Sequence, residues 1–316
     1  MENKKILILG GTGALGKTLT KRYHKDNKIM IFSRDEHKQV NMKQEFKDVS
    51  YQIGDVKDKD SICQVINEYK PDVVINTAAL KHVPICEEHP YESVKTNIIG
   101  HKNLIDCISN CNHKIEALMF ISTDKACKPI NVYGMCKAIS ERLYIDFANK
   151  QSEIKVVLCR YGNVLESTGS VIPLFKGLLD KGKKILPITD GRMTRFLISL
   201  EESVDLIEWA FNHPDSHGSI VVPKLKSLLV IDLANELGKS YAGIDDISLE
   251  YIGIRPGEKI HEEMISLEES LRTIDCKKYF MISDNIINEE TWSFASNTTI
   301  LPMDEVNSFL KSKGVF

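Results

Sequence analysis

The sequence predicts an α/β protein with a doubly wound parallel sheet and a smaller C-terminal α/β domain. Apolar, β-branched runs alternate with amphipathic segments through the first half of the chain, which is typical of strands buried on both faces between helices. The 316 residues also exceed one ordinary domain, which has about 100 to 200 residues. We expect a first domain over 1–165 and a second over 166–316, from which some segments return to the first domain.

The individual elements follow from short apolar runs and from the turn residues between them. Helical patterns fill the gaps between the strands, and beyond residue 162 the alternation loosens. No internal repeat or low-complexity linker separates the two halves, so we expect them to pack together. The predicted strands are 5–9, 28–32, 49–53, 72–76, 117–121 and 155–159. The predicted helices of the second half are 171–179, 200–211 and 228–237.

Composition excludes several classes of protein. A net charge of −3 without a basic stripe argues against nucleic-acid binding. No apolar run approaches the roughly 20 residues that span a bilayer, and the N-terminal run is too short for a signal sequence, so we expect a soluble, cytoplasmic protein. The eight cysteines form no regular framework, which predicts free thiols, and no metal site is expected.

A glycine-rich turn lies where a dinucleotide-binding turn is required. The segment Gly10–Gly16 follows the first predicted strand and precedes a helical pattern. Glycines there let the backbone approach a pyrophosphate, and the helix N-terminus supplies N–H donors. The first domain is therefore predicted to be Rossmann-like. The candidate residues are Gly10, Thr12, Gly13, Ala14, Leu15 and Gly16.

The end of the second strand bears on the choice of dinucleotide. A carboxylate there binds the ribose 2′-hydroxyl of NAD, whereas an arginine accommodates the 2′-phosphate of NADP. Ser33 and Arg34 favour NADP, although Asp35 keeps NAD as the alternative. Ligands of open α/β sheets bind at the carboxyl ends of strands. Further cofactor candidates at such ends are Asp55, Val56, Ala78, Ala79 and Lys81.

Tyr133 and Lys137 are four residues apart on a predicted helix, so both project from one face. We expect the lysine to lower the pKa of the phenol from about 10, so that the tyrosine removes a hydroxyl proton as hydride leaves the same carbon. The spacing alone is common on helices. It becomes specific after the glycine turn and a strand that ends in Ser122 and Thr123, and Thr123 joins the catalytic candidates.

Asp124 and Lys125 add chemistry that a simple dehydrogenase does not need. Once a sugar C4 hydroxyl is oxidised to a ketone, the C5 proton becomes acidic, and a base with an acid can expel the C6 hydroxyl as water. Lys125 is predicted to be the base and Asp124 the acid. Lys125 must then be neutral, and we expect an oxidised nicotinamide and partial burial to lower its pKa. The alternative without a catalytic role is a surface ion pair in a loop.

At this point the sequence resembles a known family. Its combined motifs are similar to those of extended short-chain dehydrogenases/reductases, and within them to inverting UDP-N-acetylglucosamine 4,6-dehydratases. Gly191 departs from the pattern, which has a larger residue there. The segments that carry the resemblance are 10–16, 32–36, 76–84, 122–126, 131–137, 160–164, 190–196 and 254–259.

The resemblance implies a tightly held NADP that is reduced and reoxidised within one turnover. The implied substrate is UDP-GlcNAc or a related UDP-HexNAc, and the product is UDP-2-acetamido-2,6-dideoxy-β-L-arabino-hex-4-ulose, inverted at C5. Retaining relatives more often have Asp-Glu where this chain has Asp124-Lys125, which favours inversion. The second domain would hold the substrate. The implied substrate-binding residues are Lys81, Asn163, Arg192, Thr194, Arg195, Arg255 and Glu258.

Two other functions remain open. A UDP-sugar 4-epimerase would use the same cofactor and the same tyrosine but would have no use for Asp124 and Lys125 as acid and base. A non-catalytic NADP-binding sensor would keep the glycine turn, but such proteins commonly lose the tyrosine-lysine pair. Many extended short-chain dehydrogenases associate through helices that flank the active site, so we expect a homo-oligomer.

Overall fold

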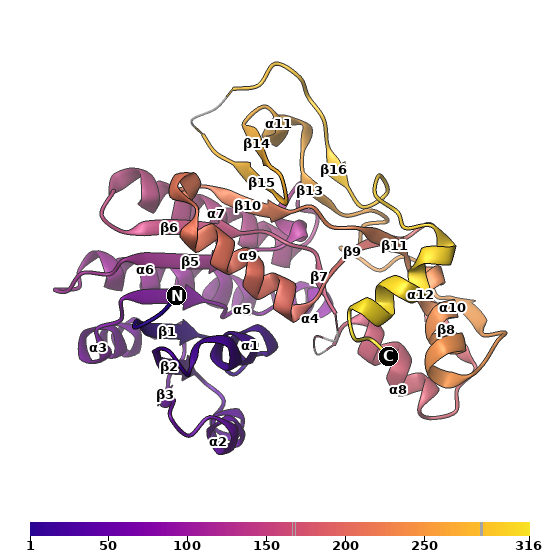
Figure 1. The fold of residues 1–316 in the computed structure, drawn as a ribbon, viewed down its shortest axis with the longest axis horizontal. Helices are drawn as coiled ribbons and strands as arrows, with labels where there is room; N and C mark the ends of the chain where they lie inside the picture. Colours follow the sequence, from indigo (N-terminus) through magenta and orange to yellow (C-terminus); the bar gives the residue numbers. More distant parts are fainter. Residues whose placement is uncertain (166, 168, 285–286) are drawn as a thin grey trace.

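The computed structural model describes residues 1–165, 167, 169–284 and 287–316 (Figure 1). In the first half, strands and helices alternate as the sequence predicts, and the predicted strands 5–9, 117–121 and 155–159 match residue for residue. These elements are β1 (Lys5–Leu9), α1 (Ala14–Tyr23), β2 (Lys28–Ser33), α2 (Glu36–Glu45), β3 (Ser50–Ile53), α3 (Lys59–Tyr69), β4 (Val73–Asn76), α4 (Val83–Glu88), α5 (Pro90–Val94), η1 (Lys95–Ile99), α6 (Gly100–Ser109), β5 (Ala117–Ile121), η2 (Asp124–Ala126), α7 (Val132–Lys150) and β6 (Lys155–Cys159).

The second half of the chain contributes shorter elements, several of which return to the large sheet. They are β7 (Asn163–Val164), α8 (Val171–Leu179), β8 (Ile185–Ile188), β9 (Thr194–Ile198), α9 (Leu200–Asn212), η3 (Pro214–Ser216), β10 (Ile220–Pro223), β11 (Ser227–Leu229), α10 (Val230–Glu236), η4 (Leu237–Tyr241), β12 (Ser248–Tyr251), β13 (Glu263–Ile265), α11 (Leu267–Ser270), β14 (Thr273–Cys276), β15 (Tyr279–Ile282), β16 (Phe294–Ala295) and α12 (Met303–Ser312).

Among the described residues, the large sheet has nine strands in the order β14-β15-β10-β6-β5-β4-β1-β2-β3. Strands β1 to β6 are parallel and have the order of a doubly wound, dinucleotide-binding sheet. Strand β10 continues the sheet in parallel beside β6, and β15 and β14 close it with antiparallel pairing. The predicted α/β fold class is confirmed.

Helices cover both faces of this sheet. Leu7 and Leu9 of β1 pack toward α3, α6 and α7, whereas Ile6 and Ile8 pack toward α1 and α9. All four side chains are fully buried, which explains why β1 reads as a continuous apolar run. The carboxyl ends of β1 and its parallel neighbours lead into the loops that form the candidate site.

A third apolar cluster joins the elements at the other end of the molecule. Figure 1 shows α8, α10 and α12 gathered there beside β8, and their buried side chains form one core. The predicted helix 228–237 begins only at Val230. Leu228 instead pairs with Arg195 in the antiparallel β11–β9 ladder, so the first part of that apolar run forms a strand.

The prediction of free thiols is wrong at two positions. Cys63 of α3 and Cys107 of α6 form a disulfide across 44 residues of sequence, because the two helices pack against each other on one face of the sheet. The cysteines at 86, 111, 127, 136, 159 and 276 are free thiols. Within the described ranges, no helix is both long and apolar enough to cross a membrane.

Candidate active site

The glycine turn brings β1, α1 and β4 into close backbone contact. Gly10 has a φ of +73°, and a Cβ there would lie 2.7 Å from the backbone of Ala78. A Cβ on Gly16 would lie 2.4 Å from the Cα of Gly11. Gly13 is the N-cap of α1 and makes no side-chain cap, and Thr12, Ala14 and Leu15 complete the turn. The first N–H groups of α1 therefore remain accessible to an anion.

At the end of β2, one side chain caps the following helix and another is an exposed cation. The Asp35 carboxylate accepts a hydrogen bond from the backbone N–H of Lys38 as the N-cap of α2. The Ser33 hydroxyl accepts one from the Gln39 side chain at 2.9 Å. Arg34 is exposed beside them. The carboxylate that kept NAD as an alternative is thus already engaged by its own helix.

The remaining cofactor candidates follow neighbouring strands. Asp55 and Val56 come directly after β3, and Val56 packs against Gly100 at the start of α6. Ala78 and Ala79 follow β4, and both are partly buried. Lys81 lies further along the same loop and is exposed. Because Ala78 meets the glycine turn, the loops after β1 and β4 border one site.

Lys137 is buried one helical turn after Tyr133 on α7. Its ammonium donates to the Ile121 carbonyl at 2.7 Å and lies 4.4 Å from the centre of the Phe120 ring. Burial lowers the pKa of Lys137 to about 7. Burial raises the pKa of Tyr133 to about 12, with Lys125 opposing. The prediction that Lys137 lowers the pKa of this phenol is therefore wrong here, because the ammonium points to the end of β5.

Asp124 and Lys125 lie on η2, directly after β5, and they are not a surface pair. The Asp124 side chain is fully buried, and its Oδ1 is 3.0 Å from Lys125 Nζ. The Thr123 hydroxyl donates to the same Oδ1 at 3.0 Å, and Lys125 also donates to the Asn163 side chain at 3.2 Å. Gly134 permits this packing, because a Cβ there would lie 2.1 Å from the Lys125 carbonyl oxygen.

The protonation of this pair differs from the sequence-based expectation. Burial alone would lower the pKa of Lys125, but the carboxylates of Asp124 and Glu262 raise it instead. The prediction of a lowered pKa is wrong because Asp124, which has the larger effect, and Glu262 together outweigh burial. Burial, assisted by Glu262, raises the pKa of Asp124 even though Lys125 acts in the opposite direction. Asp124 is thus suited to carry a proton, as an acid must.

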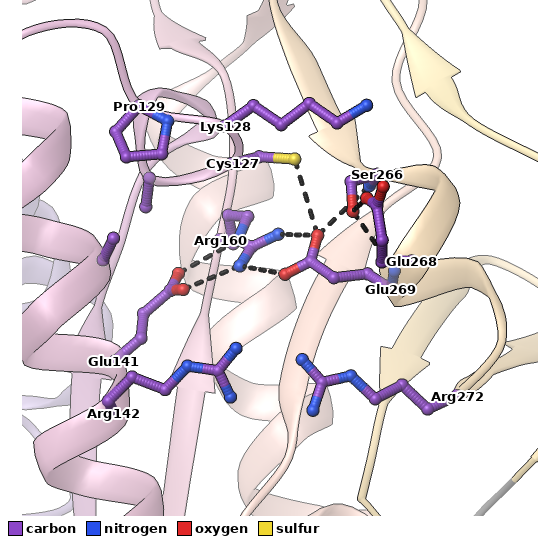
Figure 2. Close-up of a pocket in the computed structure, with 12 residues that line it drawn as sticks. Cys127, Lys128, Pro129, Glu141, Arg142, Arg160, Ser266, Glu268, Glu269 and Arg272 are labelled. Atoms are coloured by element: carbon purple, nitrogen blue, oxygen red, sulfur yellow. Dashed lines mark hydrogen bonds and ion pairs between the residues drawn. The ribbon is translucent and has the colours of Figure 1, made fainter.

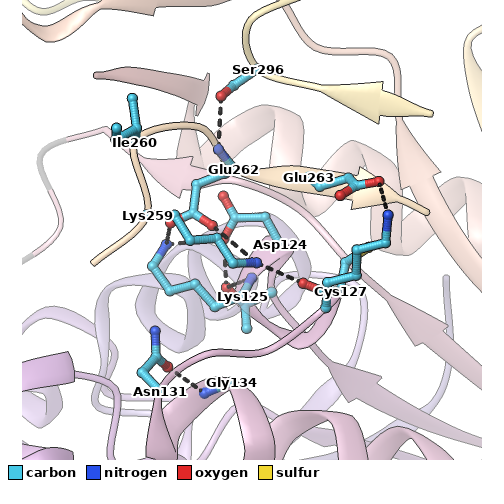
Figure 3. Close-up of polar contacts among 12 residues, drawn as sticks. Asp124, Lys125, Cys127, Asn131, Gly134, Lys259, Ile260, Glu262, Glu263 and Ser296 are labelled. Carbon is cyan, nitrogen blue, oxygen red and sulfur yellow. Dashed lines mark hydrogen bonds and ion pairs between the residues drawn. The ribbon is translucent and has the colours of Figure 1, made fainter. Parts of the chain in front are cut away.

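Glu262 is a buried carboxylate that sequence reasoning missed. Its side chain is 3% exposed, and its Oε1 lies 3.4 Å from Lys125 Nζ (Figure 3). Its Oε2 lies 4.0 Å from Lys259 Nζ and, within the described part of the chain, has no hydrogen-bond partner. Burial opposes its charge, but Lys125, Arg195 and Lys259 together lower its pKa.

Arg160 connects the catalytic segment to the C-terminal half. Its guanidinium is 1% exposed and binds Glu141 of α7 and Glu269 of α11 with two hydrogen bonds each (Figure 2). The Ser122 hydroxyl donates to Glu141 at 2.6 Å. The network borders a pocket of about 260 Å³ that also reaches Arg142. The Arg160 network joins the end of β5 and helix α7 to the segment that follows Glu262.

The expected substrate residues are spread over different surroundings. Asn163 contacts Lys125 directly. Arg195 of β9 is buried and donates to the carbonyls of Lys259 and Ile260. Thr194 is buried and bonds to His261 and Ser296. Two further residues are exposed arginines, each beside its own carboxylate: Arg192 pairs with Asp190, and Arg255 lies 3.9 Å from Glu258.

The missed residues had weak signals in the sequence. Arg160 belongs to a motif of the family resemblance, but a buried arginine cannot be distinguished from a surface one by its neighbours in sequence. Glu262 lies three residues after Lys259, beside a second glutamate and before an apolar pair. Adjacent glutamates at the start of a strand most often face solvent. Only the fold shows that Glu262 faces Lys125.

The sequence of this chain is similar to those of several known proteins. Residues 6–284 match the family described as "Polysaccharide biosynthesis protein". A Campylobacter jejuni UDP-N-acetylglucosamine 4,6-dehydratase (inverting) is 46% identical over 297 residues, which cover 90% of this chain and 85% of that protein. A Rickettsia massiliae UDP-glucose 4-epimerase is 40% identical over 290 residues, with 89% and 83% covered.

A solved structure is also similar over the full length. The structure of Pen from Bacillus thuringiensis has a TM-score of 0.91 and 29% sequence identity, and the match covers 100% of this chain and 99% of that one. The family match, the identity to the dehydratase and the order of the parallel strands agree with the resemblance in the motifs. The chain therefore belongs to the polysaccharide biosynthesis protein family of extended short-chain dehydrogenases/reductases, together with the inverting UDP-N-acetylglucosamine 4,6-dehydratases.

Proposed function

We propose that this protein is a UDP-N-acetylglucosamine 4,6-dehydratase that inverts C5. The observation that carries the proposal is the buried Asp124–Lys125 ion pair on η2. It lies close enough to Tyr133 that both of its charges act on the phenol. An acid, a base and a phenol at the carboxyl end of β5 are the groups needed for oxidation at C4 followed by elimination across C5 and C6.

The glycine turn fits a nicotinamide dinucleotide. Side chains at Gly10 and Gly16 would close the backbone cradle at the start of α1, and the uncapped N–H groups of that helix suit a pyrophosphate. When bound, the dinucleotide supplies reversible hydride acceptance. We assign NADP, because Arg34 is exposed and Asp35 is engaged as a helix cap. Thr12, Gly13, Ala14, Leu15, Ser33, Asp55, Val56, Ala78, Ala79 and Lys81 would line the remainder of this site.

Tyr133 takes the proton of the C4 hydroxyl. The phenol is nearly buried, and burial opposes its ionisation, so it depends on nearby cations to form a phenolate. Lys125 already favours the ionised form. Lys137, whose ammonium is held at the end of β5, would orient the ribose of the dinucleotide. A tyrosine thus positioned on α7 removes one proton from a defined hydroxyl.

Asp124 and Lys125 perform the elimination. Burial and Glu262 raise the pKa of Asp124, which favours the protonated form that donates to the departing C6 hydroxyl. Lys125 removes the C5 proton after it has lost its own extra proton. The Thr123 hydroxyl donates to Asp124 Oδ1 and holds that carboxyl group in place. Water leaves with one proton from Asp124 and the hydroxyl of the sugar.

Residues of the second half would bind the sugar nucleotide. Asn163 touches Lys125 and is suited to the hexose. The exposed guanidinium groups of Arg192 and Arg255 can turn from their own carboxylates to the diphosphate. Thr194 and Arg195 support the loop at 259–261 through hydrogen bonds. Glu258 and Lys81 complete the proposed set of substrate-binding residues.

The product distinguishes this function from its alternatives. UDP-GlcNAc incubated with the protein should lose the mass of one water, and NMR of the product formed in deuterated water should show a 4-keto-6-deoxy sugar with deuterium at an inverted C5. An unchanged mass with altered C4 stereochemistry would establish an epimerase, which the Rickettsia relatives keep as the second candidate. Stoichiometric NADP binding without turnover would establish a sensor.

A homo-oligomer belongs to the same proposal. Helix α7 packs against α5 and η1, and these elements and the loop before α7 expose large apolar side chains. The exposed residues are Tyr91, Ile99, Ile130, Met135 and Ile139. A second copy of the chain could cover this face. Light scattering should give more than one chain per particle, and Ile139→Glu should lower the measured mass.

A further inference from the structure

The ammonium of Lys125 lies between two buried carboxylates from different parts of the chain. Asp124 is its neighbour in sequence, at 3.0 Å, whereas Glu262 comes from the segment before β13, at 3.4 Å. Both carboxylates are almost completely buried. The mechanism proposed above uses Asp124 and Lys125 but leaves Glu262 without a role.

The two carboxylates face different charges. Asp124 meets the Lys125 ammonium and the Thr123 hydroxyl. Glu262 meets Lys125, has Lys259 at 4.0 Å from its second oxygen and feels the guanidinium of Arg195. Two carboxyl groups whose surroundings separate their affinities for a proton are assigned opposite roles in acid–base chemistry. Here burial and Glu262 raise the pKa of Asp124, whereas Lys125, Arg195 and Lys259 lower the pKa of Glu262.

Lys125 needs a proton acceptor before it can act as a base. With two carboxylates beside it, its resting form is the ammonium, which has no lone pair for the C5 proton. Asp124 cannot take the proton if it already carries the one destined for the C6 hydroxyl. Glu262 is the carboxylate whose pKa its neighbours lower, and it lies 3.4 Å from Lys125 Nζ. Like Asp124, it has an oxygen without a hydrogen-bond partner among the described residues.

We propose that Glu262 is a positioning residue that holds the Lys125 ammonium in the resting site and accepts its proton before Lys125 attacks C5. The role rests on the proposed dehydratase function. One N–H bond of the ammonium breaks and one O–H bond forms on the carboxylate, so that both side chains become neutral. The C5 proton then restores the ammonium. The other charged or titratable groups that face this pair are Asp124, Tyr133, Arg195 and Lys259.

The adjacent glutamate offers a matched control. Glu263 pairs with the exposed Lys128 at 3.1 Å and is the next residue in the chain, so Glu263→Gln removes the same charge one position away. Glu262→Gln keeps the size of the side chain, and Glu262→Asp keeps its charge with a shorter reach. Thermal melting establishes that each variant is folded before it is compared.

The first measurement needs no substrate. Lysine labelled with nitrogen-15 at Nζ is titrated by NMR, with Lys125→Met identifying the signal. In Glu262→Gln the pKa of Lys125 should fall by about one unit or more, whereas Glu263→Gln should leave it unchanged and Glu262→Asp should restore part of the shift. An identical Lys125 titration in wild type and folded Glu262→Gln overturns the proposal.

The second measurement follows the reaction of UDP-GlcNAc. Water loss by Glu262→Gln should be about 10-fold slower or more, with KM and the formation of reduced dinucleotide retained. Unchanged water loss would overturn the role as proton acceptor. If wild-type protein forms no dehydrated product but the titration still shifts, the dehydratase function is rejected and Glu262 is left as the holder of Lys125 alone.

Discussion

Arg160 and Glu141 form a bidentate ion pair in the interior, with Nε and Nη2 of the arginine 2.9 and 2.7 Å from the two carboxylate oxygens. Removal of one partner leaves an uncompensated buried charge, which costs about 3 to 5 kcal/mol. We expect Arg160→Met to lower the free energy of unfolding by that amount in urea denaturation. Arg142→Met, which removes an exposed guanidinium one residue after Glu141, should change it little, and equal effects would contradict the assignment.

Lys137 should make stability depend on pH. Burial lowers its pKa from 10.5 to about 7, so between those values the unfolded chain binds a proton that the folded protein does not. Stability then rises with pH through this window, and below about pH 7 the full cost of burying the ammonium remains. Lys137→Met should remove this rise in stability, which is on the order of a few kcal/mol. The test is the difference in melting temperature between wild type and variant from about pH 6, which is below this window, to about pH 10, which is near its upper end.

Tyr133→Phe should separate binding from chemistry. The ring fills the same space, so dinucleotide affinity should be retained, while turnover of UDP-GlcNAc should fall by about 10² to 10⁴ because the proton acceptor for the C4 hydroxyl is lost. Calorimetry gives the affinity and mass spectrometry the turnover. Full retention of turnover would exclude the assigned role of the phenol.

Gly16→Ala should damage the cradle at the start of α1. The new Cβ would lie 2.4 Å from the Cα of Gly11, so α1 must move away from the turn, at a cost of about 1 to 3 kcal/mol. Urea denaturation and NADP titration should both show the loss. Gly177→Ala is the control, because a Cβ on that glycine of α8 meets nothing within 4 Å.

Arg34→Ala tests the choice of dinucleotide. If this exposed guanidinium binds the 2′-phosphate, its removal costs about 1.5 to 3 kcal/mol of NADP affinity, the worth of a charged hydrogen bond. NAD lacks that phosphate, so its affinity should change little. Equal losses for both dinucleotides would show that Arg34 does not read the phosphate.

The parts of the fold that the sequence predicts well are those set by local pattern. The run 117–121 is apolar at every position because both faces of β5 are covered. The prediction that a helix begins at residue 228 is wrong because Leu228 pairs with Arg195 in a β-ladder, and local periodicity cannot show that partner. The disulfide between Cys63 and Cys107 was missed for the same reason, since packing of α3 on α6 brings the two cysteines together.

The candidate site divides in a similar way. Asp124, Lys125 and Asn163 were each expected to act in the site, and the structure brings them into contact. Their protonation could not be predicted, because the carboxylates of Asp124 and the distant Glu262 together outweigh the effect of burial on the pKa of Lys125. Distance in sequence is the common obstacle: a motif contains its own residues but not the carboxylate that the segment before β13 brings into contact with it.

The position of Glu269 bears on how this protein is synthesised. Arg160 lies 109 residues before that carboxylate, and β6 receives its outer neighbour β10 only from residues 220–223. As a nascent chain leaves the ribosome N-terminus first, the six parallel strands can form while β6 is still an open edge and the buried guanidinium has only Glu141. The most aggregation-prone moment therefore falls late in translation, after the dinucleotide-binding strands have emerged and before the C-terminal segment has arrived.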